Sequence, residues 1–118
     1  MKVINPAEVE PVVATDRPLF TGGEVKARFL LGREDAKELG IGIMSFGPGG
    51  RTKMHTHTSE QILFITEGRG LVGTEDEEIV VTPGTVVFFP AGEKHFHGAT
   101  ADSPVSHLTI APPHKTEF

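Results

Sequence analysis

Apolar and polar residues alternate with a period of two along most of the chain, which is typical of strands that bury one face. The stretches that we expect to form strands are 24–31, 40–46, 52–57, 61–66, 70–74, 78–81, 85–89, 95–99 and 105–110. Turn residues, mainly glycine and proline, separate nearly all of them. The only helical candidate, Arg33–Leu39, spans about two turns and is too short to be stable without tertiary packing. The pattern therefore predicts an all-β sandwich or barrel.

Length, charge and composition narrow the class of protein. The chain has 118 residues, close to the usual size of one domain, so we expect a single core. Its net charge of −5 offers no basic surface to a nucleic acid, and we expect no such partner. No apolar run is long enough for a signal peptide or a membrane span, so we expect no membrane partner and a cytoplasmic location. Cysteine is absent, so nitrogen and oxygen atoms must hold any metal ion.

Four of the six histidines form two pairs with the pattern His-x-His. His55 and His57 are two residues apart, so in a strand both side chains leave the same face. His95 and His97 repeat this arrangement, and each pair follows a turn rich in glycine or proline. Paired imidazoles on one face can approach a metal ion at about 2.0–2.1 Å. The alternative, that each histidine forms only ordinary hydrogen bonds, explains a lone histidine better than it explains two such pairs.

The residues around these pairs resemble the two sequence motifs of the cupin superfamily. The matching positions are Gly49, His55, His57, Gln61 and Gly68 in the first motif and Gly84, Pro90, Gly92 and His95 in the second. The resemblance spans about Ile41 to Ile110 and implies a jelly-roll barrel, or double-stranded β-helix, built as one cupin domain. Residues 23–111 would form the barrel core, 1–22 a strand-like arm and 112–118 a tail. The resemblance also implies one divalent metal ion, bound by His55, His57, Gln61 and His95.

The chain departs from the cupin pattern at one ligand position, where the pattern has glutamate and this chain has Gln61. The neighbouring Glu60 is an alternative ligand, but Gln61 shares the phase of Leu63 and Ile65, so we favour Gln61. Three neutral imidazoles and a neutral amide leave the full charge on the ion, which makes it a stronger Lewis acid. The ligand types suit manganese, iron, cobalt, nickel or zinc. The residues do not choose among these metals, and manganese is expected only from the similarity to one group of cupins described below.

Two further histidines are candidates for proton transfer. His97 shares the face of His95, and His107 lies on the last predicted strand, in phase with Thr109. An uncoordinated imidazole near the metal would act as a general acid or base near neutral pH. The alternative is that these side chains only fill the barrel or orient a ligand through hydrogen bonds. We expect His114, in the tail, to be a solvent-exposed bystander.

A substrate would need an apolar cavity beside the metal. The side chains expected to line it are Ile43, Met54, Leu63, Ile65, Val87 and Phe89. The alternative is that these residues are simply core. Arg51 and Lys53 precede the first ligand pair and could clamp a substrate carboxylate, although we favour solvated loop charges at these positions.

Within the cupins, the chain is most similar to the small manganese-dependent hydroxynitrile lyases. The similarity rests on the ligand set, on residues 90–99 and on residues 107–110. It implies lyase chemistry on a small organic substrate, namely cleavage or formation of a cyanohydrin, with an uncoordinated histidine moving the proton. Two alternatives stay open: a quercetinase-like cupin dioxygenase, and a small-molecule-binding module without catalysis. We also expect a homodimer, because the strand-like segments 9–13 and 19–21 could pair with a partner's sheet.

Overall fold

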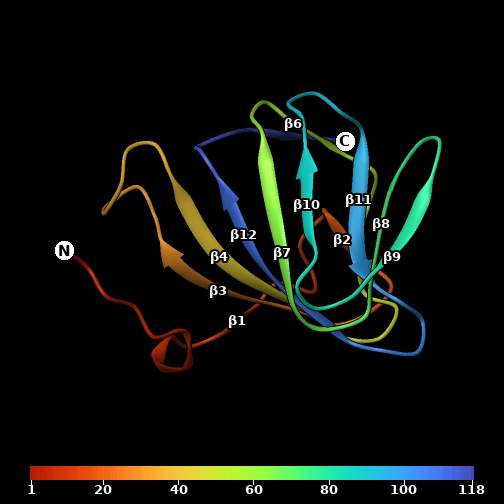
Figure 1. Ribbon diagram of the computed structural model, residues 1–118, viewed down its shortest axis with the longest axis horizontal. Coiled ribbons are helices and arrows are strands. Elements are labelled where there is room, and N and C mark those ends of the chain that lie inside the picture. The colour runs from red at the N-terminus through yellow and green to blue at the C-terminus, as the bar shows by residue number, and fades with distance from the viewer.

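The computed structural model describes residues 1–118 and contains two antiparallel sheets that face each other across a barrel (Figure 1). The first sheet has the order β1-β3-β4-β12-β7-β10, and the second has the order β2-β5-β11-β8-β9. The first comprises β1 (Val12–Val13), β3 (Val25–Leu31), β4 (Gly40–Phe46), β7 (Gln61–Gly68), β10 (Val86–Phe89) and β12 (Val105–Ala111). The second comprises β2 (Phe20–Thr21), β5 (Arg51–Thr52), β8 (Gly70–Thr74), β9 (Glu78–Val81) and β11 (His95–Ala99). This architecture confirms the predicted jelly-roll barrel.

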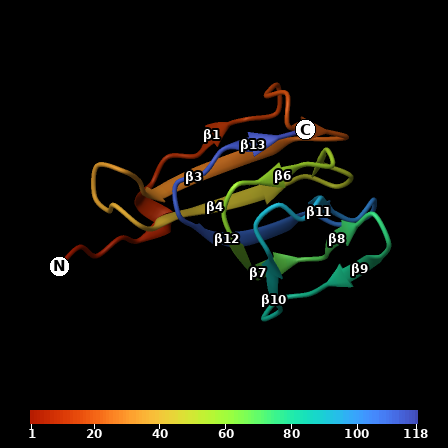
Figure 2. The ribbon, with the colours of Figure 1, turned by 90° about the horizontal axis from the view of Figure 1, so that it is seen from above.

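Three short elements complete the chain. The 3-10 helix η1 (Pro6–Glu8) precedes β1, and β6 (Thr56–His57) pairs with β13 (Thr116–Glu117). Figure 2 shows the barrel from above, with β6 and β13 side by side. No helix in the structure is long and apolar enough to cross a membrane.

The period-two pattern decides which side chains enter the barrel. In β7, Gln61, Leu63 and Ile65 are buried, whereas Ile62 and Phe64 are exposed. The buried apolar side chains of both sheets form one core, made of Ala14, Val25, Phe46, Leu63, Ile65, Val72, Val81, Phe89, Ala99 and Val105. Removal of this apolar surface from water is the main driving force that holds the two sheets together.

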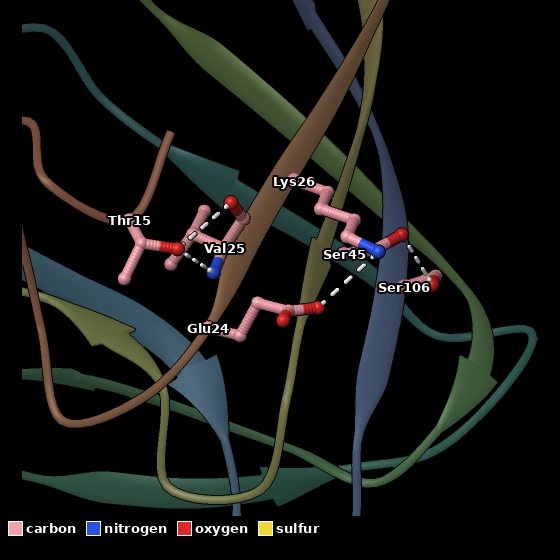
Figure 3. Close-up of polar contacts among 6 residues, drawn as sticks. All are labelled: Thr15, Glu24, Val25, Lys26, Ser45 and Ser106. Atoms are coloured by element: carbon pink, nitrogen blue, oxygen red, sulfur yellow. Dashed lines mark hydrogen bonds and ion pairs between the residues drawn. The ribbon is translucent and has the colours of Figure 1, made fainter. Parts of the chain in front are cut away.

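Polar contacts join the N-terminal arm and the central strands of the first sheet (Figure 3). The backbone N–H of Val25 donates to the hydroxyl of Thr15 at 3.0 Å. The hydroxyls of Ser45 and Ser106 share a hydrogen bond of 2.8 Å between β4 and β12. The arm is thus fastened to the sheet rather than projecting from it.

The structure corrects two predicted elements. The helix expected over Arg33–Leu39 is wrong, because this segment is a loop with a single turn in which Asp35 and Ala36 donate to the carbonyl of Gly32. The paired strands β3 and β4 fix both ends of the loop, and the segment has no helix neighbour to pack against. The strand expected over residues 52–57 is two strands, β5 and β6, which belong to different sheets. A continuous strand is impossible there because the chain crosses between sheets.

The segments expected as arm and tail both pair with strands of the expected barrel core. β1 pairs with β3, β2 pairs with β5, and β13 of the tail pairs with β6. β1 and β2 each lie at the edge of a sheet, where a strand of a second chain could pair. The homodimer expected from these segments stays a prediction.

The motif glycines occupy turns that other residues rarely adopt. Gly49, Gly68, Gly84 and Gly92 all have φ between 78° and 91°. Gly68 connects β7 to β8, and a Cβ atom there would collide with the carbonyl of Pro104. This turn therefore requires glycine for two reasons, backbone conformation and space.

We predict that Gly68→Ala lowers the free energy of unfolding by about 1–3 kcal/mol, because alanine would be strained at this φ. The matched control is Gly32→Ala, where φ is not positive and no atom lies within 4 Å of the added Cβ. The control should change stability by less than about 0.5 kcal/mol. Urea unfolding of both variants measures the difference, and equal midpoints would contradict the prediction.

Candidate metal centre

Backbone hydrogen bonds bring the two motifs together. His55 and His95 form an isolated antiparallel bridge in which each N–H donates to the other's carbonyl at 2.9 Å. The N–H of Gly92 donates to the carbonyl of His57, also at 2.9 Å. As a result the rings of His55, His57 and His95 share one small volume, with centroids 4.3 to 5.2 Å apart.

Backbone carbonyls fix the tautomers of two of these histidines. The Nδ1 atom of His55 lies 2.7 Å from the carbonyl of Lys53, and that of His95 lies 2.9 Å from the carbonyl of Glu93. A carbonyl oxygen only accepts, so in each neutral ring Nδ1 carries the hydrogen and Nε2 carries a lone pair. The ring of Phe89 stacks on that of His95 with centroids 3.9 Å apart, which holds its plane.

His57 is held by the C-terminal strand. Its Nδ1 lies 2.9 Å from the hydroxyl of Thr116 in β13, and its Nε2 lies 3.1 Å from Nε2 of His55. The hydroxyl can accept from Nδ1, which leaves a lone pair on Nε2, or donate to it. About 3 Å is also the separation of two adjacent ligands that are each about 2.1 Å from one octahedral ion.

Among the predicted ligand residues, two buried polar atoms have no hydrogen-bond partner, Oε1 of Gln61 and Nε2 of His95. An unsatisfied buried group costs about 1–3 kcal/mol. A bound cation is a partner that both atoms could accept, so the residues present fit a metal ion. Glu60, the alternative to Gln61, is exposed.

Burial keeps the cluster neutral. It lowers the pKa of His55 to about 4 and, together with the neighbouring ring of His55, lowers the pKa of His57 to about 3. Burial also lowers the pKa of His95. Neutral imidazole is the form that binds metals. The ring nitrogens of His55, His95 and His97 lie within 4.8 Å of one another, and this three-histidine cluster fits a divalent ion.

The second histidine pair has a different arrangement. Nδ1 of His97 lies 3.1 Å from Nε2 of His107, whose Nδ1 lies 3.0 Å from the hydroxyl of Thr109. Burial lowers the pKa of His107 to about 4 and that of His97 well below its ordinary value. His97 and Thr109 line the cavity, whereas His107 does not. Any role of His107 in chemistry must therefore pass through His97.

A cavity of about 460 Å³ opens beside the cluster, between β3, β4, β12 and the segment that leads to β13. None of the six side chains expected to line it does so. Leu63, Ile65 and Phe89 belong to the core, Val87 packs against that core, and Ile43 and Met54 are half-buried outside the cavity wall. Alternation shows which side chains point inward, but not which end of a barrel stays open. The apolar part of the wall instead includes Phe20, Phe29, Leu31, Ile41 and Met44.

Arg51 and Lys53 do not line the cavity either. The guanidinium of Arg51 lies over the ring of Phe96, with Cζ 4.0 Å from the centroid, and Lys53 is exposed. Neither side chain is therefore placed to hold a substrate carboxylate in this cavity.

Sequence reasoning missed the contribution of the C-terminal segment. His114, expected to be a bystander, is exposed but lines the cavity, and its ring centroid is 4.5 Å from that of His57. Thr116 orients His57, and Thr52 accepts a hydrogen bond of 3.1 Å from the N–H of His97. Threonines carry no motif of their own, so only the pairing of β13 with β6 shows where Thr116 lies.

Comparison with known proteins agrees with this geometry. The model of the family described as "Cupin domain" matches residues 42–111, which include every residue of the cluster. The chain belongs to the cupin domain family. This cupin is 43% identical over 68 residues to an (R)-mandelonitrile lyase of Granulicella tundricola, across 57% of the chain and 52% of the relative.

Two further comparisons concern other activities. This cupin is 30% identical over 91 residues to a dimethylsulfoniopropionate lyase of Ruegeria pomeroyi, across 75% of the chain and 59% of the relative. The chain therefore spans only about half to three fifths of these curated relatives. The solved structure of the polyketide cyclase RemF from Streptomyces resistomycificus matches with a TM-score of 0.83 and 25% identity, over 100% of this chain and 86% of that chain.

The buried histidines predict how the metal-free protein responds to acid. Their pKa values are lower in the folded chain than in the unfolded chain, so unfolding binds protons below about pH 6.5. Stability should fall as the pH falls from 6.5 toward 4, by up to about 1.4 kcal/mol per pH unit for each histidine. Urea unfolding at several pH values measures this slope. His107→Gln should make it shallower, and a flat profile would contradict the prediction.

The hydroxyl of Thr116 predicts an effect on metal affinity. Thr116→Val keeps the shape of the side chain but removes the partner of Nδ1 of His57, so affinity for Mn²⁺ should fall about 10- to 100-fold. Thr116→Ser keeps the hydroxyl and should keep most of the affinity. Titration with Mn²⁺ followed by calorimetry compares the two variants, and equal affinities would show that the hydrogen bond plays no part.

Proposed function

We propose that this cupin is a metal-dependent lyase that cleaves and forms cyanohydrins of small carbonyl compounds. One observation carries the proposal: a cluster of neutral nitrogen and oxygen donors, with no carboxylate in the cavity wall, lies beside a buried histidine pair able to move a proton. The similarity to a mandelonitrile lyase over just over half of the chain supports the choice of reaction.

The residues that would hold the ion are His55, His57, Gln61 and His95. Oε1 of Gln61 and Nε2 of His95 are buried and have no hydrogen-bond partner. A divalent ion bound there supplies Lewis acidity toward the cyanohydrin oxygen or cyanide. His97 is the alternative third imidazole, because its ring nitrogen lies within 4.8 Å of those of His55 and His95. We assign it to proton transfer instead, since its Nδ1 already contacts His107.

Cleavage of a cyanohydrin needs one proton removed and one returned. The hydroxyl loses its proton, the carbon–carbon bond to the nitrile breaks, and the electron pair leaves with cyanide, which takes up a proton to give HCN. In the proposed role, Nε2 of His97 accepts the hydroxyl proton. His97 suits this role because a ring nitrogen of it lies within 4.8 Å of those of His55 and His95, and its Nδ1 contacts His107.

The hydrogen-bonded chain from Thr109 through His107 to His97 explains how a histidine of such low pKa could act as a base. When Nε2 of His97 gains a proton, its Nδ1 can pass one to Nε2 of His107. His97 thus returns to a neutral ring, and the positive charge rests on His107, whose Nδ1–H donates to the hydroxyl of Thr109. The reverse shift returns His97 to its starting state.

The test is cleavage of mandelonitrile by protein loaded with Mn²⁺, with benzaldehyde measured by absorbance and oxygen excluded. We expect cleavage that EDTA abolishes and that oxygen does not affect, whereas a dioxygenase would require oxygen. His97→Ala should keep the metal and lower the cleavage rate about 10²- to 10⁴-fold. Absence of cleavage by fully loaded protein would refute the proposal.

Metal content separates ligands from proton carriers in the same experiment. His57→Ala and Gln61→Ala should lose bound metal, whereas His97→Ala should retain it. Glu60→Ala is the matched control for Gln61→Ala, because Glu60 is its exposed neighbour and should not affect metal content. Loss of metal from His97→Ala but not from His57→Ala would identify the other three-histidine set as the ligands.

A further inference from the structure

The cavity wall is electropositive although the protein is acidic. The chain contains 16 aspartate and glutamate residues against 11 lysine and arginine residues, which gives a net charge of −5. Among the residues that line the cavity, however, are Arg17, Arg28 and Arg33, and none is aspartate or glutamate. Acidic side chains outnumber basic ones in the chain as a whole, so a wall with three arginines and no acid is a local reversal of charge.

The arginines of this wall have no carboxylate partner. The two ion pairs of the protein are Lys2–Asp35 and Lys26–Glu24, and neither includes an arginine. Asp35, two residues from Arg33, already forms an ion pair with Lys2, in which Nζ and Oδ1 are 2.7 Å apart. The fork of a guanidinium matches the two oxygens of a carboxylate, so unpaired arginines in a cavity favour an anionic ligand.

Arg17 and Arg33 are exposed and Arg28 is half-buried, and Arg17 is the one whose guanidinium packs on another residue of the wall. Its guanidinium lies over the ring of Phe29, with Cζ 5.8 Å from the centroid, and both residues line the cavity. The Nε of Arg28, in contrast, donates to the carbonyl of Val9 at 3.1 Å, so part of its donor capacity is already used. The backbone N–H and carbonyl of Arg17 form hydrogen bonds, but its guanidinium has no hydrogen-bond or ion-pair partner in the structure.

The rest of the wall describes the body of the ligand. Apolar side chains such as Phe20, Leu31, Ile41 and Met44 line the same cavity, and its volume of about 460 Å³ suits a small molecule. A free inorganic anion would leave this apolar surface without a partner. The combination favours an apolar body that carries one negative group.

We propose that the cavity binds a small organic carboxylate, with the carboxylate held by Arg17 and the apolar body against Phe20, Ile41 and Met44. His55, His57 and Gln61 line the same cavity, so a ligand bound there would share it with the candidate metal ligands. This inference rests on the proposed function for the reaction and adds the substrate class: a carbonyl compound or cyanohydrin that bears a carboxylate.

The test is calorimetric binding of phenylacetate and of phenylacetamide, its neutral isostere, to protein loaded with Mn²⁺ at low ionic strength. We expect phenylacetate to bind at least about tenfold more tightly, as for a charge-assisted hydrogen bond. Arg17→Gln should remove this preference, and Arg17→Lys should keep part of it. Arg69→Gln, which removes an exposed arginine outside the cavity wall, is the matched control and should leave it unchanged.

Three outcomes would overturn the proposal: equal affinity for the two probes, a preference that survives Arg17→Gln, or inorganic phosphate binding as tightly as phenylacetate. If Arg17→Gln does not fold, the comparison of the two probes on the unaltered protein still decides. Mandelonitrile is neutral, so its cleavage tests the proposed function separately. If mandelonitrile is not cleaved but phenylacetate is still preferred, the proposed function fails and the ligand class stands. If mandelonitrile is cleaved but phenylacetate is not preferred, only the ligand class is rejected.

Discussion

The paired hydrogen bonds between His55 and His95 are the constraint on which the rest of the site depends. They join residues 40 positions apart in the sequence, and they place one ligand candidate from each motif across a single bridge. The bond between Gly92 and His57 extends this junction. Without it, the imidazoles would belong to two independent loops, and each would lose side-chain entropy to reach a common ion. The backbone hydrogen bonds fix these positions when the protein folds, so the donor atoms are already in place.

Preorganisation continues in the side chains. Backbone carbonyls, not carboxylates, orient His55 and His95, and a threonine hydroxyl orients His57. Metal sites often use a carboxylate for this purpose, which adds negative charge near the ion. In this cupin both the donors and their supporting partners are neutral, as are the histidines beyond them. The same lack of negative charge extends to the cavity wall and its arginines, so the metal centre and the proposed carboxylate site share one electrostatic character.

The fold and the cluster were largely predictable from the sequence, because alternation and motif spacing act locally. Strand positions such as 40–46, 70–74 and 95–99 match the structure at both ends. The cavity was not predictable. Which end of the barrel opens depends on long-range packing of β3, β4 and the C-terminal segment, and no period-two pattern reports it. Thr116 illustrates the limit: it lies 59 residues from His57, and only the pairing of β13 with β6 brings them together.

The neutral ligand set has a consequence for metal exchange. Carboxylate ligands bind a divalent ion partly through charge, and an amide oxygen such as that of Gln61 contributes only its dipole. An ion held by imidazoles and one amide would therefore leave more readily than an ion held by the same imidazoles and a glutamate. The metal content of the isolated protein would then reflect the medium around it more than any selectivity of the barrel.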